Sequence, residues 1–139
     1  MEIKINDKDL KKKLNSLMKK TNDLSPVMKD AALIMKQSVL KNFDEQGTEN
    51  GKWKDLSKST KEHKKRKKGT AYPILVDSGK LKKSFNTSYT KYTAKVWTGV
   101  KYGVYHQTGT RKMPKRPFMH IRDEHIEIIK KIILKYLEE

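Results

Sequence analysis

The stretch that decides the fold is DLSPVMKDAALIMKQSVLKNF, residues 23–43. Ser25 can cap the free amides at a helix start, and Pro26 suits the first helical turn. Apolar residues then recur at helical spacing, which predicts a central core helix that ends near Asn42. The apolar stripe consists of Met28, Ala31, Ala32, Met35, Val39 and Phe43, broadened by Leu33, Ile34 and Leu40.

Two short elements are predicted before this helix. Residues 1–5 alternate polar and apolar side chains, as a strand does, with Ile3 and Ile5 on one face. Asp7 is placed to cap a second helix that runs to about Lys20. The apolar stripe of that helix is narrow, which is typical of a helix laid on a sheet.

A β-hairpin and further helical segments are predicted downstream. Residues 85–92 and 94–100 are rich in Thr, Tyr, Val, Trp and Phe, which indicates two strands joined by a short turn. Residues 102–107 predict a short turn of helix closed by Gly109. Acidic residues from Asp123 onward favour the positive end of a last helix. Its apolar face contains Ile121, Ile128, Ile129, Ile132, Ile133, Tyr136 and Leu137.

Between these elements lie segments without apolar periodicity. Residues 44–72 predict a long polar loop, and loops of this length are usually functional or disordered. Trp53 and Leu56 are isolated apolar anchors within it, so part of the loop is expected to dock on the domain or on a neighbour. Asp77 or Ser78 can cap one or two helical turns over residues 80–84. Residues 110–118 contain two prolines and are expected to be extended and exposed.

These segments predict one α+β domain over residues 1–139. A small antiparallel sheet packs with a long central helix and with N- and C-terminal helices, and residues 44–72 form a long basic loop. The chain has no Cys, which excludes a disulfide framework, a thiol nucleophile and a Cys-based zinc site. No apolar run approaches the roughly 18 residues that span a bilayer, so a soluble, cytoplasmic setting without membrane contact is expected.

The charge balance is strongly basic. Lys and Arg number 33 against 16 Asp and Glu, a formal charge of +17, which attracts polyanions such as DNA. Nearly all of these cations are Lys, which lacks the fork with which Arg reads guanine, so base-specific recognition is disfavoured. A second interpretation is that an AT-rich genome simply encodes Lys at surface positions.

The densest basic run is KEHKKRKK, residues 61–68. It is either a solvated loop or a surface that contacts phosphates without sequence specificity. The residues expected to face DNA or a partner in this run are Lys61, Lys64, Lys65, Arg66, Lys67 and Lys68.

No catalytic or metal-binding pattern accompanies the four histidines. His120 and His125 flank acidic residues, but their spacing does not place both on one helical face. His106 lacks a nucleophile elbow, a Cys or paired carboxylates, so a small hydrolase built on it is a hypothesis kept only for testing. A structural His that hydrogen bonds across the hairpin or to the 44–72 loop is the favoured interpretation. No enzyme activity, metal or cofactor is expected.

Four motifs follow one another between residues 43 and 118. They are Phe43 followed by Gly51-Lys52-Trp53 with Leu56-Ser57 and Thr60; Leu75 to Leu81 with Asp77, Gly79 and Ser84; Tyr102-Gly103 with His106-Gln107-Thr108-Gly109; and Arg116-Pro117-Phe118. In this order they resemble the motifs of the phage virion morphogenesis and tail-completion proteins, a family that grades into head-tail joining proteins. Compared with that family's pattern, Gly103 replaces the commoner Ala, and a Pro usually found near Gly51 is missing.

The resemblance implies a structural virion protein that forms a homo-oligomeric ring in the neck or at the top of the tail and carries out no reaction. The implied partners are other neck, connector and tail proteins, with non-specific contact to phage DNA as a further possibility, in a virion assembled in the host cytoplasm. Arg116-Pro117-Phe118 is expected to form a rigid interface contact. The residues expected to hold the fold are Trp53, Leu56, Asp77, Gly79, Leu81, Tyr102, His106, Gln107 and Gly109. A non-specific DNA-binding module of cellular type is the alternative.

Overall fold

The computed structural model describes residues 2–6, 23–70, 73–75 and 79–138. The described chain forms small antiparallel sheets and α-helices, so the predicted α+β class is confirmed. It divides into two compact units. Unit 1 takes its described residues from 39–85 and 98–120, and unit 2 takes them from 2–38, 86–97 and 121–139. No helix in the described part is both long enough and apolar enough to cross a membrane.

A three-stranded sheet lies in unit 2, except for Phe85 and Thr98, which belong to unit 1. It consists of β1 (Glu2–Asn6), β5 (Thr93–Thr98) and β4 (Phe85–Tyr89), in the order β1-β5-β4. Strands β1 and β5 are antiparallel, with Ile3 opposite Val96. The predicted first strand and hairpin are confirmed, although the hairpin strands end earlier than predicted.

Helix α2 (Ser25–Glu45) confirms the predicted core helix. All six residues of its predicted stripe are buried, because they recur on one face of the helix. Leu33, which was expected to broaden the stripe, is 45% exposed and lies off that face. Ser25 was expected to be the cap but lies inside the helix. Asp23 Oδ1 instead accepts the Ser25 N–H at 2.8 Å, because its side chain reaches the first free amide.

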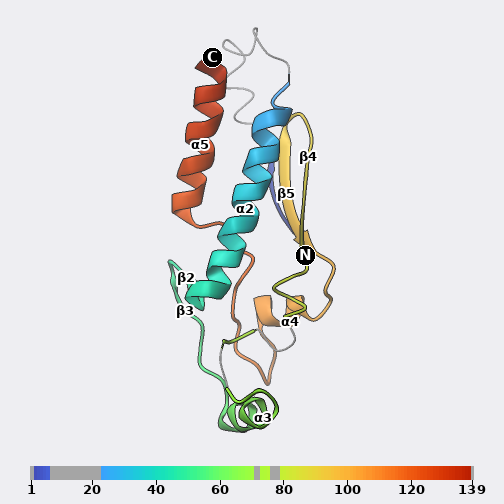
Figure 1. The fold of residues 1–139 in the computed structure, drawn as a ribbon, viewed down its shortest axis with the longest axis vertical. Helices are drawn as coiled ribbons and strands as arrows, with labels where there is room; N and C mark the ends of the chain where they lie inside the picture. Colours follow the sequence, from blue (N-terminus) through green and yellow to red (C-terminus); the bar gives the residue numbers. More distant parts are fainter. Residues whose placement is uncertain (1, 7–22, 71–72, 76–78, 139) are drawn as a thin grey trace. The chain divides into compact units, whose positions relative to one another are not determined.

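The last helix, α5 (Asp123–Glu138), also forms as predicted and runs beside α2 in unit 2 (Figure 1). Its buried face contains Ile129 and Ile133. Ile128 was assigned to the same face but is 44% exposed, because one helical step turns it away from its buried neighbour. The Ser38 hydroxyl of α2 accepts the Arg122 N–H at 2.7 Å, just before α5 begins.

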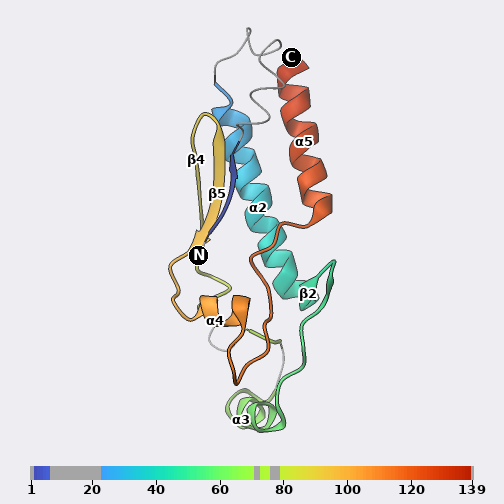
Figure 2. The ribbon, with the colours of Figure 1, turned by 180° about the vertical axis from the view of Figure 1, so that it is seen from behind.

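Unit 1 overturns the prediction of a long loop over residues 44–72. A hairpin of β2 (Gly47–Thr48) and β3 (Gly51–Lys52) leads into α3 (Lys58–Lys68), as Figure 2 shows. Lys and Glu favour helix, but α3 carries no apolar stripe, so periodicity could not reveal it. Its ends are nevertheless marked in the sequence by Ser57, whose side chain accepts the Thr60 N–H, and by Gly69 at φ 78°.

Helix α4 (Gly103–Thr108) confirms the predicted short helix closed by Gly109, which has φ 77°. Residues 79–84 form a single turn, in which the Lys83 N–H donates to the Gly79 carbonyl at 3.0 Å. The helix predicted over residues 7–20 and the caps predicted at Asp77 and Ser78 lie outside the described residues.

Candidate functional site

The predicted motif residues meet in unit 1 on one short segment, residues 116–120. The Trp53 indole Nε1 donates to the Pro117 carbonyl at 2.7 Å. The Gln107 side-chain oxygen accepts the N–H groups of Phe118 and Met119, both at 3.0 Å. Side chains from separate motifs therefore satisfy the backbone of the 116–120 segment, which has no regular secondary structure of its own.

Arg116 and Asn42 complete this network. The Arg116 guanidinium donates to the Lys54 carbonyl at 2.8 Å and to the Asp55 carbonyl at 2.9 Å. The Asn42 amide donates to the Phe118 carbonyl at 2.8 Å and to the His120 carbonyl at 2.9 Å. Because these donors are fixed by packing, they hold the 116–120 segment against the end of α2 and against the segment that connects β3 to α3.

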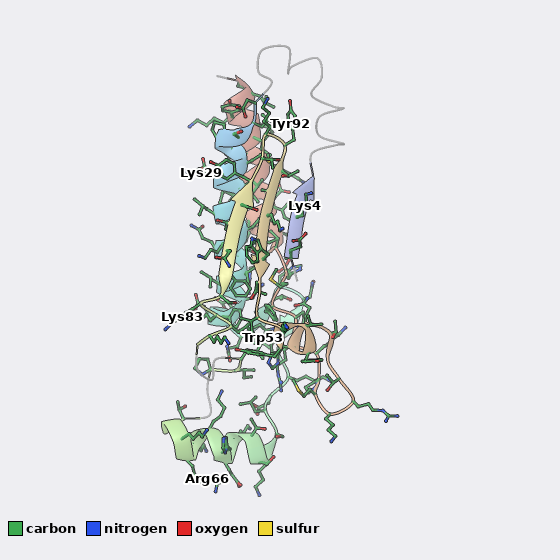
Figure 3. The ribbon with its side chains drawn as sticks, turned by 90° about the vertical axis from the view of Figure 1, so that its right-hand side faces the viewer. Lys4, Lys29, Trp53, Arg66, Lys83 and Tyr92 are labelled. Carbon is green, nitrogen blue, oxygen red and sulfur yellow. The ribbon has the colours of Figure 1, made fainter. Side chains whose placement is uncertain are left out.

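Four aromatic rings pack around the same segment. Phe43 lies 5.5 Å from Trp53, 5.8 Å from Phe85 and 5.7 Å from Phe118, centroid to centroid. The tilted and edge-on arrangements are those that aromatic pairs favour. These rings form the core of unit 1, and Figure 3 labels Trp53 within it.

The burial of this segment corrects one prediction. Arg116-Pro117-Phe118 was expected to be exposed and to offer a rigid contact to a neighbour. Phe118 is fully buried and Arg116 is only 6% exposed, because the ring fills the aromatic core and the guanidinium bonds two internal carbonyls. In this structure both side chains stabilise the fold of unit 1.

A pocket of about 570 Å³ opens beside this core, between α3, α4, Leu75 and the chain around residues 79–81 and 112–116. Leu56, Leu81 and Tyr102, which were predicted to hold the fold, line it, as does Gly79. The other lining residues are Ser57, Thr60, His63, Lys64, Leu75, Lys80, His106, Lys112, Met113, Pro114 and Arg116.

His106 lies in the wall of this pocket, with its ring edge-on to Tyr102 at 6.0 Å. Its Nδ1 is buried and has no hydrogen-bond partner among the described residues, so this nitrogen does not make the predicted bond across the hairpin or to the described part of residues 44–72. Burial, and then repulsion from Arg116, lower the pKa of His106. The ring is therefore held neutral, and the described residues around it supply no nucleophile hydrogen-bonded to it.

Helix α3 places the predicted basic run on two kinds of surface. Lys65, Arg66 and Lys67 are exposed, and Arg66 points away from the helix in Figure 3. Lys64 is buried and donates to the Pro73 carbonyl at 2.9 Å, and Lys61 pairs with Asp55. These two lysines were predicted to face DNA or a partner, but their charges are directed toward groups of unit 1.

Lys58, at the first position of α3, is also exposed and belongs with the outward cations. The side chain of Lys68 and residue Asp77 lie outside the described residues. The outward basic face of α3 is defined here as Lys58, Lys65, Arg66 and Lys67.

Sequence reasoning missed two polar residues that are fully buried, Ser38 and Asn42. A signal for both was available, because they fall at helical spacing from Met35 and Val39, on the apolar face of the core helix. A polar residue on such a face is expected to find a buried partner. Reasoning from the sequence also missed the pocket, whose lining residues come from four separated segments.

The described residues contain no group of three or more His, Cys, Asp and Glu side chains able to hold a metal ion. The motif side chains enclose the 116–120 segment, and a basic pocket and a basic helix face lie at the surface of unit 1.

Comparisons with known proteins match this chain to one family. The model of the phage virion morphogenesis family matches residues 5–138. The Mu-like prophage FluMu G protein 1 of Haemophilus influenzae is 31% identical over 105 residues, which cover 74% of this chain and 72% of the relative. No solved structure matches. The match over nearly the whole chain, together with the ordered motifs that meet in unit 1, shows that this protein belongs to the phage virion morphogenesis family.

Proposed function

We propose that this chain is a structural subunit of a phage or phage-like particle that forms a homo-oligomeric ring in the neck or at the top of the tail. Its partners are copies of itself and other neck, connector and tail proteins. The observation that carries the proposal is that the motif side chains form hydrogen bonds within the fold. Trp53, Gln107 and Arg116 each bond to the backbone of unit 1, so the family signature serves to build a stable surface for assembly.

The surface left outside this network supports assembly as the role. Tyr102, Val104 and Tyr105 are large apolar side chains that are 39%, 46% and 57% exposed within four consecutive residues. Tyr is enriched at protein interfaces because its ring contributes apolar area and its hydroxyl a hydrogen bond. A ring subunit needs such contacts on its neighbours, whereas an isolated soluble protein does not.

Imaging of particles tests this proposal. A particle that carries a tagged copy of the chain is expected to show a ring of subunits at the junction of head and tail. Loss of the gene is expected to leave heads and tails unjoined. Density for the tagged chain in the head shell or at the distal tail end, or its absence from finished particles, would contradict the proposed position.

Contact with DNA is a second candidate function, and the outward basic face of α3 favours it. A surface of this kind binds phosphates by releasing counterions, so affinity falls steeply with salt and does not depend on base sequence. Within a ring, the same face would lie against the DNA channel. As a cellular-type module, the free chain would bind DNA tightly by itself.

The salt dependence of DNA binding separates these cases. Replacing Lys58, Lys65 and Lys67 by Gln is expected to reduce the slope of log affinity against log salt by about 2–3, since each phosphate contact contributes about 0.9. The matched control replaces Lys29, Lys83 and Lys135, which are also exposed and lie outside α3 (the first two are labelled in Figure 3), and changes the net charge by the same amount. Equal slopes for both triple variants would exclude α3 as the DNA-binding face.

A further inference from the structure

The pocket of unit 1 carries charge of one sign. Six of its lining side chains are Lys, Arg or His, and none of the described lining residues is Asp or Glu. Lys64 and Arg116 are buried in its wall and already donate to carbonyl groups, while Lys80 and Lys112 are exposed at its edge. The described lining residues therefore favour anionic groups inside the pocket.

The same pocket has an apolar side. Leu56, Leu75, Leu81, Met113 and Pro114 line it together with the cations. The phosphates of a DNA backbone would pair with the cations, but they would offer no apolar group to the apolar side chains of the pocket. An acidic peptide surface with an apolar side chain at its centre satisfies both, because carboxylates match the lysines and the apolar side chain fills the remaining volume.

One described surface of this chain has that composition. Asp123, Glu124 and Glu127 are exposed in the first two turns of α5, beside the 44% exposed Ile128. Glu124, Glu127 and Ile128 are spaced i, i+3 and i+4, so they share one face of the helix.

Another acidic group of this chain fits less well. Asp44, Glu45 and Glu49 lie near the end of α2 and in the hairpin that follows it. Each lies within ion-pair distance of a basic side chain of its own chain, as Glu124 does of His125 and Glu127 of Lys130. What separates the two groups is the apolar side chain, because no exposed large apolar residue lies among Asp44, Glu45 and Glu49. The acidic start of α5 is therefore the complementary surface within the described residues.

Net charge explains why a contact of this kind is needed. Copies of a chain with a formal charge of +17 repel one another, so stable neighbours require acidic groups placed against basic ones. A contact between two different surfaces, pocket and helix, is heterologous, and repeated contacts of this type close into a ring when the rotation permits.

We propose that the pocket of one copy receives the acidic start of α5 from the next copy in the ring. Ile128 lies against the apolar wall, and Glu124 and Glu127 face Lys80 and Lys112. This inference rests on the proposed ring and specifies which two surfaces form it.

Disulfide trapping tests the contact directly, because the chain has no Cys of its own. A variant with both Lys112→Cys and Ile128→Cys is expected to form a ladder of linked oligomers on mild oxidation, at high concentration and in assembled particles. Either single variant can link at most two copies. The control variant combines Lys29→Cys with Ile128→Cys, and an equal ladder from this control would overturn the proposal.

Exchange of charge gives a second, independent test. Lys80→Glu with Lys112→Glu, and separately Glu124→Lys with Glu127→Lys, are each expected to reduce the yield of joined particles about tenfold or more. All four changes in one chain are expected to restore most of the yield, because each contact then regains opposite charges. Circular dichroism and thermal unfolding establish that every variant folds.

The outcomes separate this inference from the proposed function. If particles of the unaltered chain contain no ring, the proposed function fails. If a ring is present but the fourfold variant stays defective, the inference fails and the ring proposal stands. Two results for the variant Lys80→Glu with Lys112→Glu would overturn the inference and assign the pocket to another occupant. If its rings stay intact but no longer join the next particle protein, the occupant is that protein. If it loses salt-dependent DNA binding, the occupant is DNA.

Discussion

Asn42 shows how much one buried amide contributes in this protein. Its side chain is fully buried and donates to two backbone carbonyls of the 116–120 segment. Asn42→Leu removes both bonds. The Phe118 carbonyl keeps the His120 N–H as its donor, whereas the His120 carbonyl loses the Asn42 amide, so we expect a loss of about 2–4 kcal/mol in the free energy of unfolding. Chemical denaturation measures it.

The matched control for Asn42 is Gln37→Leu, an exposed position on the same helix. A polar-to-Leu change there should alter stability by less than about 0.5 kcal/mol. If the two variants were equally stable, the role assigned to the buried amide would be wrong.

Gly109 and Gly69 separate two costs of adding a methyl group. Both have positive φ, but Gly69 has ψ −9°, in the left-handed region, and Gly109 has ψ 168°, in a region that essentially only glycine adopts. A Cβ on Gly109 would lie 2.8 Å from the Lys115 nitrogen, whereas a Cβ on Gly69 meets nothing within 4 Å. Gly69→Ala should therefore cost about 1 kcal/mol and Gly109→Ala clearly more. Thermal unfolding of the two variants compares them, and a similar loss in both would contradict the close approach.

His106 predicts a dependence of stability on pH. Because burial and Arg116 lower its pKa below the ordinary 6.5, the unfolded chain binds the proton more readily than the folded chain. The stability that this neutral ring contributes is fully present above pH 6.5 and is lost as the pH falls toward the lowered pKa. The His106→Gln variant should show a smaller fall in unfolding free energy between pH 7.5 and 5.5. An unchanged pH profile would show that another group titrates.

At the scale of elements, α3 depends on its caps more than on packing. It has no apolar stripe, and one of its first free amides, the Thr60 N–H, donates to the Ser57 hydroxyl. Ser57→Ala should lower the stability of α3 by about 1 kcal/mol. Hydrogen exchange should therefore become faster in α3 and stay unchanged in α2 and α5, with Ser88→Ala, at an exposed position of β4, as the control. Faster exchange throughout the chain would mean that α3 does not open by itself.

The elements differ in how far the sequence could predict them. The buried stripe from Met28 to Phe43 follows from periodicity, and the β4–β5 hairpin from its β-branched and aromatic residues. Helix α3 could not be found in this way, because its residues are polar on every face. The burial of Arg116 and Phe118 could not be predicted either, since it depends on carbonyl and aromatic partners from segments far away in the chain.

At the scale of the whole molecule, each unit contains one of the two tryptophans. Trp53 belongs to unit 1 and Trp97 to unit 2. Helix α2 supplies residues to both units, so we expect them to unfold together, as the predicted single domain would. The variant Trp97→Phe leaves Trp53 as the single tryptophan, which reports on unit 1. The variant Trp53→Phe leaves Trp97, which reports on unit 2.

In each variant, the fluorescence transition should coincide with the loss of helical circular dichroism in urea. A fluorescence midpoint that differs from the circular dichroism midpoint would show that the units unfold separately. The pocket belongs to the same scale, because no local pattern predicts a cavity whose described wall comes from residues 56–64, 75, 79–81, 102–106 and 112–116.

The network around the 116–120 segment also sets an order of events during synthesis. The side chains of Asn42 and Trp53 leave the ribosome long before the carbonyls that they will bond, and Phe43 appears before the ring that completes its cluster. Unit 1 therefore cannot close its core until Phe118 has emerged, and until then a nascent chain exposes aromatic residues beside a dense run of cations. Translational pausing before that point should prolong chaperone dependence, whereas a pause after it should not.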